Sequence, residues 1–289
     1  MLYNRQNELL YLIEKVGRVT RTQIQKLAFL SCVNSTSPSF DFIPYNYGPY
    51  SVTLQNDLDY LVNQGYLVYA NDSYARVGDN KPSVNTKRWN ALDEVIENYK
   101  DYSATTLMQI IYRKYPSYAA NSVKAEELLT LEEMATVKAC IPRNEETQIF
   151  TIGYEGKSLE KYLYQLYENN IHLLVDVRAS SYSMKKEFIG SRLASGCKLL
   201  KIDYIHIPEL GIPNQYRKDI ADKDMLFQFY QSELLSHRTK EIGQVAELLQ
   251  RHKRIALTCF EALHSDCHRF YLAEKLLAYL DGRVSVEHL

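Results

Sequence analysis

The sequence lacks any run of apolar residues that approaches the roughly 20 needed to cross a bilayer. It also lacks a signal-peptide pattern at its start, so we expect a cytoplasmic protein with no membrane partner. Cysteine is scarce, since there are five residues, an odd number, and their spacing repeats no disulfide framework. In a reducing compartment such cysteines serve as thiols, metal ligands or catalysts, and not as structural cross-links.

An excess of one charge sign is also missing, because the formal net charge is −1. A chain without a global basic field is not drawn onto nucleic acid or membranes by its charge alone. Tyrosine, in contrast, is abundant, with 24 residues. A tyrosine ring buries apolar area and keeps a polar tip, so these residues either form wet and stacking surfaces or replace phenylalanine in the core.

The length of 289 residues exceeds what a single core usually serves, so we expect more than one domain. A proline followed by polar residues at 142–146 precedes a β-like run and is the clearest boundary. We predict a winged-helix-like domain over residues 1–89, a helical connector over 90–146 and an α/β domain over 147–289.

Apolar residues at helical spacing predict helices over 6–15, 21–31 and 51–63. Two short β-like runs follow at 66–70 and 74–77, separated by turn residues. Three helices followed by a hairpin is the order of elements in a winged helix, so the N-terminal region is predicted to be mainly helical with that architecture.

Winged helices often bind DNA, but residues 1–100 hold ten basic and ten acidic side chains. Affinity for DNA comes mainly from neutralising phosphates, whereas Asp57 and Asp59 on the predicted third helix would repel them. We therefore expect a protein partner or a packing role for this domain. Basic residues around and beyond the predicted wing, at positions 76, 81, 87 and 88, keep DNA contact as the alternative.

Two segments of this region resemble a known domain. Residues 26–30 (KLAFL) precede the turn at 42–50 (FIPYNYGPY), in which Gly48 permits an unusual φ and Pro49 pre-sets the first turn of the next helix. The pair resembles the Panacea or SocA-like antitoxin domain, where a KLLYL-type helix precedes an aromatic-Gly-Pro turn. The resemblance implies a regulatory or partner-binding module of toxin–antitoxin and phage-conflict systems.

The region 147–289 alternates β-like and helical segments. Strands are predicted at 148–152, 173–177, 204–207, 254–259 and 284–286, and helices after residue 158, over 223–251 and over 267–280. Strands that alternate with helices imply a mainly parallel, doubly wound α/β sheet. Ligands of such sheets bind beyond the carboxyl ends of the strands, where this sequence places its unusual polar residues.

The segment 259–269 joins the fourth strand to a helix. We predict Asp266 as the helix N-cap, so that Cys267, His268 and Arg269 fall in the first turn, where free N–H groups and the helix dipole favour an anion. A thiol there has a lowered pKa, and Arg269 can form a bidentate hydrogen bond with a phosphate or carboxylate. Two alternatives stay open: the cysteines pack in the core, or the cluster binds zinc. Because the spacing matches no standard zinc ribbon or finger, no metal ligand is assigned.

Polar residues also follow the first two strands. A carboxylate within an apolar strand is costly unless it is paired, so Asp176 is either half of an ion pair with Arg178 or Arg269, or a general base or hydroxyl-binding group. Gly153 and Tyr154 lie in a loop that opens a helix. That loop could cradle a phosphate, and the Tyr154 ring could stack on a base.

Several motifs occur in an order that resembles the family called domain of unknown function 488. They are Thr151-Ile152-Gly153-Tyr154, Val175-Asp176-Val177-Arg178, Ser183, Phe188, Tyr204 to His206, Pro208-Glu209-Leu210-Gly211, and Cys259-x-Glu261 with Cys267-His268-Arg269. The resemblance covers roughly residues 148–275 and implies an α/β domain. The sequence departs from the family at Ser181, where a proline is usual, and at Ile212, which replaces a second glycine. The resemblance locates a site and gives no reaction.

These residues together predict an enzyme that acts on a nucleotide, a nucleic-acid base or another phosphate-bearing ligand, in phage defence or DNA modification. The candidate catalytic residues are Asp176, Glu261, Cys267 and His268. The candidate binding residues are Gly153, Tyr154, Arg178, Tyr204, His206, Cys259 and Arg269. No cofactor is assigned, and the expected partner is an anionic small molecule or nucleic acid.

Two other functions remain open. The first is a non-enzymatic ligand sensor or interaction protein, in which the winged helix is the output domain. The second is sulfur or phosphate transfer, because a strand, a cysteine, a loop, an arginine and a helix in that order are similar to rhodaneses and cysteine phosphatases. Nine residues separate Cys259 from Arg269, which is more than that signature allows, so transfer is the less favoured of the two.

Overall fold

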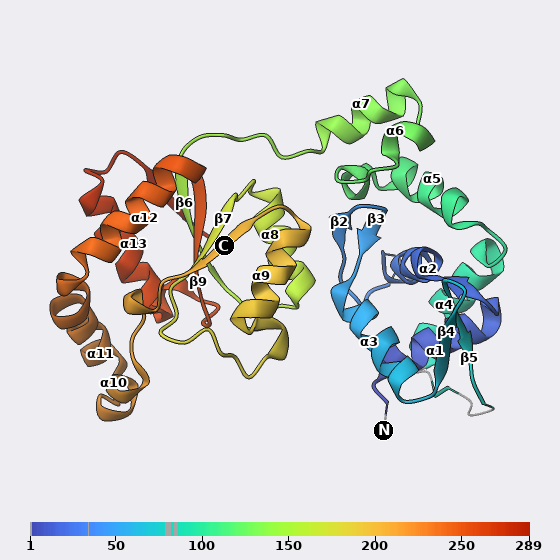
Figure 1. Cartoon of the computed structure of the whole chain (residues 1–289), viewed down its shortest axis with the longest axis horizontal. Coiled ribbons are helices and arrows are strands. Elements are labelled where there is room, and N and C mark those ends of the chain that lie inside the picture. The colour runs from blue at the N-terminus through green and yellow to red at the C-terminus, as the bar shows by residue number, and fades with distance from the viewer. Residues whose placement is uncertain (1, 34, 79–81, 84–85) are drawn as a thin grey trace. The chain divides into compact units, whose positions relative to one another are not determined.

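The computed structural model describes residues 2–33, 35–78, 82–83 and 86–289. The chain forms two compact units, Met1–Ile141 and Pro142–Leu289, which are drawn in Figure 1. In the described part of the chain, no helix combines the length and the apolar character that crossing a bilayer requires.

The N-terminal unit begins with the elements that the sequence predicts. Its first three helices are α1 (Asn4–Val16), α2 (Arg21–Val33) and α3 (Val52–Asn63). The hairpin is β4 (Leu67–Ala70) with β5 (Ser73–Arg76), and the short strand β1 (Val19–Thr20) extends it by pairing antiparallel with β5. This order of elements agrees with the prediction, and the winged-helix assignment itself stays a prediction.

The aromatic-Gly-Pro turn differs from expectation. It forms the hairpin of β2 (Ile43–Tyr45) and β3 (Gly48–Tyr50). Pro49 therefore lies in β3 and not in the first turn of the next helix, so that prediction was wrong. The hydroxyl of Ser51 begins α3 instead, because it accepts a hydrogen bond from the Leu54 N–H at 3.2 Å. Gly48 has a φ of 89°, and a Cβ there would lie 2.6 Å from the Tyr112 ring, so glycine is required.

The region 90–141 packs into the core of this first unit. It contains α5 (Ala104–Lys114), η1 (Pro116–Ala119), α6 (Ala125–Leu128) and α7 (Leu131–Ala139), preceded by α4 (Thr86–Tyr99). Leu92, Ile111 and Val137 share one buried cluster with Leu12 and Phe29 of the first two helices. The predicted connector thus shares the core of the predicted winged helix, because its apolar faces are buried against α1 and α2.

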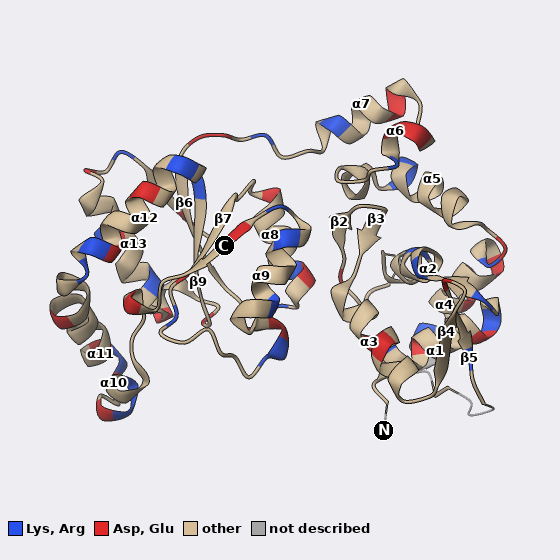
Figure 2. Cartoon of the chain, in the orientation of Figure 1, with Lys and Arg blue, Asp and Glu red and all other residues tan. Residues whose placement is uncertain are grey.

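Several charges of the N-terminal unit are committed to ion pairs. The Arg88 guanidinium is buried and donates to both carboxylate oxygens of Glu8, at 3.2 and 3.0 Å. Arg76 lies 3.8 Å from Glu14, and buried Asp57 accepts a hydrogen bond from Gln6 at 2.7 Å. Position 81 lies outside the described residues, as does the side chain at 87. Figure 2 shows acidic and basic residues mixed along the helices, with no basic stripe on the described helices.

The C-terminal unit is built on a five-stranded sheet that is parallel throughout, as predicted. Its order is β10-β6-β9-β7-β8. The strands are β6 (Gln148–Gly153), β7 (Leu173–Asp176), β8 (Asp203–His206), β9 (Arg254–Cys259) and β10 (Ser285–His288). The register pairs Gly153 with Cys259, and Asp176 with both Thr258 and His206. Four carboxyl ends therefore meet at one edge of the sheet.

Helices lie on both sides of this sheet in Figure 1, with α8 (Leu159–Glu168) and α9 (Gly190–Leu199) on one side and α12 (Thr239–His252) and α13 (His268–Tyr279) on the other. Two helices were not predicted from the sequence, namely α9 and the short helix α10 (Asn214–Asp219). The predicted helical region over 223–251 is interrupted. It consists of α11 (Lys223–Phe229), a π-helical turn at Tyr230–Leu234, a 3₁₀ turn at Leu235–His237 and then α12.

One lysine of the N-terminal unit gives a test of its packing. Lys26 is 2% exposed, and its Nζ donates to the Pro49 carbonyl at 3.0 Å. Burial lowers the pKa of Lys26 to about 7, whereas an unfolded lysine has a pKa of about 10.4. Between these values the unfolded state binds one more proton than the folded state, so stability rises with pH. Below about pH 7 Lys26 is protonated in both states, so the cost of burying its charge lowers the unfolding free energy by its full amount.

We predict that Lys26→Met removes this pH dependence. The unfolding free energy of the unmodified chain, minus that of the variant, should increase by up to about 1.4 kcal/mol per pH unit between pH 7.5 and 9.5. Urea denaturation of the full chain, followed by Trp89 fluorescence, measures the difference, and Lys15→Met at an exposed lysine is the control. Parallel pH curves for the chain and the Lys26 variant would contradict the buried, neutral lysine.

Candidate functional site

A cavity of about 280 Å³ opens at the carboxyl-end edge of the sheet. Loops that follow β6, β7 and β9 surround it, together with the start of α10. The polar side chains that line it are Tyr154, Arg178, Ser180, Tyr182, Asn214, Arg217, Cys259, Glu261 and His268. Five of these were predicted site residues, and they come from three different strand ends.

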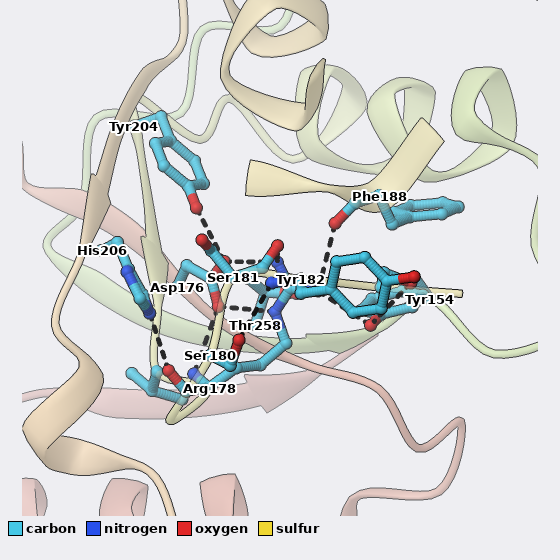
Figure 3. Close-up of polar contacts among 12 residues, drawn as sticks. Tyr154, Asp176, Arg178, Ser180, Ser181, Tyr182, Phe188, Tyr204, His206 and Thr258 are labelled. Carbon is cyan, nitrogen blue, oxygen red and sulfur yellow. Dashed lines mark hydrogen bonds and ion pairs between the residues drawn. The ribbon is translucent and has the colours of Figure 1, made fainter. Parts of the chain in front are cut away.

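The buried ion pair of Asp176 and Arg178 forms one half of the site (Figure 3). Asp176 is fully buried and accepts hydrogen bonds from Arg178 Nε at 2.8 Å, from the Arg178 backbone N–H at 3.2 Å and from the Tyr204 hydroxyl at 2.7 Å. Burial alone would lower the pKa of Arg178, but the hydrogen bonds and charge of Asp176 outweigh it and raise that pKa. Burial, followed by the charge of Asp176, raises the pKa of the Tyr204 hydroxyl.

Arg178 also organises the aromatic wall of the cavity. Its Nη1 donates to the Tyr154 hydroxyl at 2.8 Å and to the Phe188 carbonyl at 3.1 Å. The Tyr154 ring stacks on Phe188 with centroids 4.4 Å apart and planes at 9°, and Tyr154 is only 3% exposed. Tyr154 therefore already has a stacking partner within the protein. The accessible rings at the cavity are those of Tyr182, which is 70% exposed, and Phe260, which is 42% exposed.

Two of the predicted binding residues hold backbone in place. The Nε2 of His206 lies 2.7 Å from the Arg178 carbonyl oxygen. At Gly153, an added Cβ would lie 1.8 Å from the Glu261 carbonyl oxygen, so only glycine allows β6 to approach the loop after β9. The N–H groups of Tyr154 and Glu155 donate to the Phe260 carbonyl at the same place. Neither His206 nor Gly153 lines the cavity.

Two thiols and an imidazole form the other half of the site. Cys259, Cys267 and His268 are each at most 3% exposed. The Nδ1 of His268 lies 3.6 Å from Cys259 Sγ and 3.7 Å from Cys267 Sγ. Its Nε2 lies 3.0 Å from the Val177 carbonyl oxygen, which can only accept, so Nε2 carries a proton. Nδ1 is thereby aimed at both sulfurs.

The pKa values of Cys259 and Cys267 are shifted in opposite directions. Burial alone would raise the pKa of Cys267, but hydrogen bonds from Cys259 and His268 and the charges of His268 and Arg269 lower it to about 2. The hydrogen bond to Cys267 and burial raise the pKa of Cys259. Burial, followed by the charge of Cys267, raises the pKa of Glu261, whose Oε2 lies 3.3 Å from Cys259 Sγ. The surroundings thus favour deprotonation of Cys267 over deprotonation of Cys259.

The helix start at this cluster differs from the prediction by one residue. The helix α13 begins at His268, and Cys267 is its N-cap residue without a side-chain capping bond. Asp266 does not cap the helix, because it lies in a 3₁₀ turn at His264–Asp266 and pairs with Lys223 at 2.9 Å. That extra turn places the N-cap position on Cys267.

Arg269 lies away from the cavity. It is fully buried, and its Nη1 and Nη2 donate to the carbonyls of Glu261 and Ala262 at 2.6 and 3.0 Å. It therefore fixes the loop that carries Glu261. The partly exposed arginine of the cavity is Arg217, whose Nη1 lies 3.8 Å from Glu261 Oε1. Arg217, Asn214 and Tyr182 were not predicted as site residues, because residues in short helices and irregular loops follow no periodic pattern that would single them out.

Residues 158–276 match the family model described as Domain of unknown function DUF488. The matched range holds the Asp176–Arg178 pair and the whole of 259–269, and it begins after the predicted motif at 151–154. The match supports the predicted resemblance for the C-terminal unit. The resemblance of the N-terminal unit to the Panacea or SocA-like domain stays a prediction. A search of curated proteins gives no match.

The ion pair yields a prediction about stability. Asp176→Asn keeps the shape of the side chain and leaves the Arg178 charge buried without a counter-charge, which costs roughly 3–5 kcal/mol. Tyr204→Phe removes one hydrogen bond to the same carboxylate and should cost about 1 kcal/mol. Urea unfolding of the full-length variants, followed by circular dichroism, compares the two. Equal losses would show that the charge of Asp176 is not what stabilises this edge of the sheet.

Proposed function

We propose that the C-terminal unit is an enzyme domain that acts on a nucleotide, a nucleic-acid base or another phosphate-bearing ligand. The observation that carries the proposal is a single cavity lined by Cys259, Glu261 and His268 together with Arg178 and Arg217. Catalysis requires that reactive groups converge on one space that a substrate can enter. These five side chains do so from the loop after β7, the end of β9 and the loop that follows it, α10 and the start of α13.

The buried cluster favours an enzyme over a sensor. A sensor of an anion needs cationic and hydrogen-bonding groups. Binding an anion does not require two buried thiols packed against an imidazole and a carboxylate. Groups with strongly shifted pKa values gather at catalytic sites because their chemistry depends on those shifts. The alternative, a ligand-sensing or interaction protein with the N-terminal unit as its output, requires the cavity to bind a ligand and leave it unchanged.

The lining of the cavity favours a small ligand that carries a ring and an anion. Its volume lies near the lower limit of small-molecule sites, which span roughly 300–1,000 Å³. The exposed ring of Tyr182 and the half-exposed ring of Phe260 offer surfaces for a base. Arg178 is already in an ion pair with Asp176, and Arg269 is hydrogen-bonded to backbone carbonyls. We therefore assign binding of the anion to the Arg217 guanidinium and the Asn214 amide, which line the cavity.

For the N-terminal unit we propose a winged-helix-like, Panacea-related module that binds a protein partner. The ion pairs of Arg88 with Glu8 and of Arg76 with Glu14 support this role, since both arginines were candidates for contact with DNA. With the resemblance to an antitoxin domain, this role favours a cytoplasmic protein of phage defence or DNA modification.

Arg217→Ala tests the anion site. Charge-assisted hydrogen bonds contribute roughly 1.5–3 kcal/mol, so this variant should bind a mononucleotide about 10- to 100-fold more weakly. Calorimetry with AMP, GMP, CMP and UMP, each beside its nucleoside, makes the measurement, and Arg192→Ala on the exposed face of α9 is the matched control. Affinity that Arg217→Ala leaves unchanged would overturn the assignment. A bound nucleotide that chromatography finds unaltered after long incubation would favour the sensor.

DNA binding by the full chain should be weak. The balance of charge over residues 1–100 leaves little phosphate neutralisation, so mobility shifts at low salt should require micromolar protein or more. Nanomolar binding to duplex DNA at 150 mM salt would contradict the assignment of a protein partner to the N-terminal unit.

A further inference from the structure

We infer that Cys259, Cys267 and His268 form a three-ligand site for a zinc-class divalent metal ion, with a fourth position open to the cavity beside Glu261. The ligand atoms of these residues all lie within 4.8 Å of one another, and all three side chains are buried. The inference concerns the same cavity as the proposed enzyme and stands on the arrangement of the donor atoms, whatever the substrate is.

The distances within the cluster fit a tetrahedral ion. A zinc ion with Zn–S bonds of about 2.3 Å and a Zn–N bond of about 2.0 Å places each sulfur roughly 3.5 Å from the nitrogen. The observed separations from His268 Nδ1 are 3.6 Å to Cys259 Sγ and 3.7 Å to Cys267 Sγ. Both sulfur–nitrogen distances therefore match those of a tetrahedral ion to within a few tenths of an ångström, and the two sulfurs lie within 4.8 Å of each other.

The orientation of His268 supports the same conclusion. Its Nε2–H donates to the Val177 carbonyl, so Nδ1 is the ring nitrogen that faces the two sulfurs and can bind an ion between them. Histidine ligands of metals are commonly held through the other ring nitrogen by a carbonyl or carboxylate in this way. A hydrogen-bonded thiol–imidazole pair needs one cysteine, whereas here a single nitrogen has two sulfurs at nearly equal distances. A metal ion satisfies all three donors at once.

The donor set selects the class of ion. Two thiolates and one imidazole suit zinc and similar transition metals, while magnesium and calcium require oxygen ligands. Neither cysteine forms a disulfide, so both sulfurs are available as ligands. No metal site was predicted from the sequence, because the spacing of these residues matches no zinc finger or ribbon. The structure explains the spacing, since one ligand ends a strand and the other two begin the next helix.

The open fourth position gives the site a catalytic form. Cys259 and His268 line the cavity, and so does Glu261, whose carboxylate lies within hydrogen-bonding reach of the Cys259 sulfur. A metal in such a three-ligand site acidifies a bound water and can present it as a nucleophile. In this arrangement Glu261 would accept a hydrogen bond from that water and orient it toward the cavity. Arg269 positions Glu261 through its hydrogen bonds to the loop carbonyls.

Metal binding can be measured without any substrate. The full chain, reduced and freed of metal with EDTA, should take up one zinc ion per chain, and cobalt should give the intense sulfur-to-cobalt charge-transfer and tetrahedral d–d absorption bands. X-ray absorption of the zinc form should show two sulfur atoms at about 2.3 Å and two lighter atoms at about 2.0 Å. A folded chain that retains no zinc, or a cobalt form without charge-transfer bands, would overturn the inference.

Variants then assign the ligands. Cys259→Ser and Cys267→Ser should weaken zinc binding by more than about a hundredfold, beyond the roughly 10- to 100-fold that loss of an orienting partner costs. Cys140→Ser, at a half-buried cysteine of the other unit, is the matched control and should keep full affinity. Glu261→Gln should keep the zinc. Loss of zinc in Glu261→Gln would contradict the open position, and equal loss in all three cysteine variants would contradict the assigned ligands. These readouts involve no nucleotide, so their failure is distinct from failure of the proposed enzyme.

Discussion

The hydrogen bond from His268 to the carbonyl of Val177 joins the two halves of the site. On one side, Val177 lies between Asp176 and Arg178, whose buried ion pair fixes the end of β7. On the other, His268 begins α13 and aims its second nitrogen at Cys259 and Cys267. A rotation of this ring would leave a carbonyl unpaired and separate the imidazole from both sulfurs, so a single bond determines whether the cluster exists.

The surrounding contacts make this geometry rigid. Gly153 lets the backbone of β6 come close to the loop after β9, and Arg269 holds two carbonyls of that same loop. Both residues act on backbone and leave the cavity to side chains with reactive or binding groups. The Asp176–Arg178 pair is internally neutral, so the charge that a ligand meets comes mainly from Arg217, Glu261 and the sulfur cluster.

The sequence predicted the parallel sheet of the C-terminal unit and the edge of that sheet at which its polar residues gather, because both follow from strong local signals. Runs of apolar residues identified the strands, and the rule that parallel sheets bind ligands at their carboxyl ends placed Arg178, Cys259, Glu261 and His268 at one edge. The sequence could not show which way each side chain points. Arg269 seemed suited to an anion, but it turns toward backbone carbonyls, and the helix start shifted from Asp266 to Cys267 because a 3₁₀ turn intervenes.

The most direct test of this account is the protonation state of the His268 ring, read from long-range ¹H–¹⁵N correlation spectra of the ¹⁵N-labelled full chain, with His268→Gln for assignment. The account predicts a proton on Nε2, held by Val177, with and without zinc, and loss of any proton from Nδ1 when zinc is added. A neutral ring that carries its proton on Nδ1 alone would contradict it, because that ring could neither donate to Val177 nor direct a lone pair at the two sulfurs.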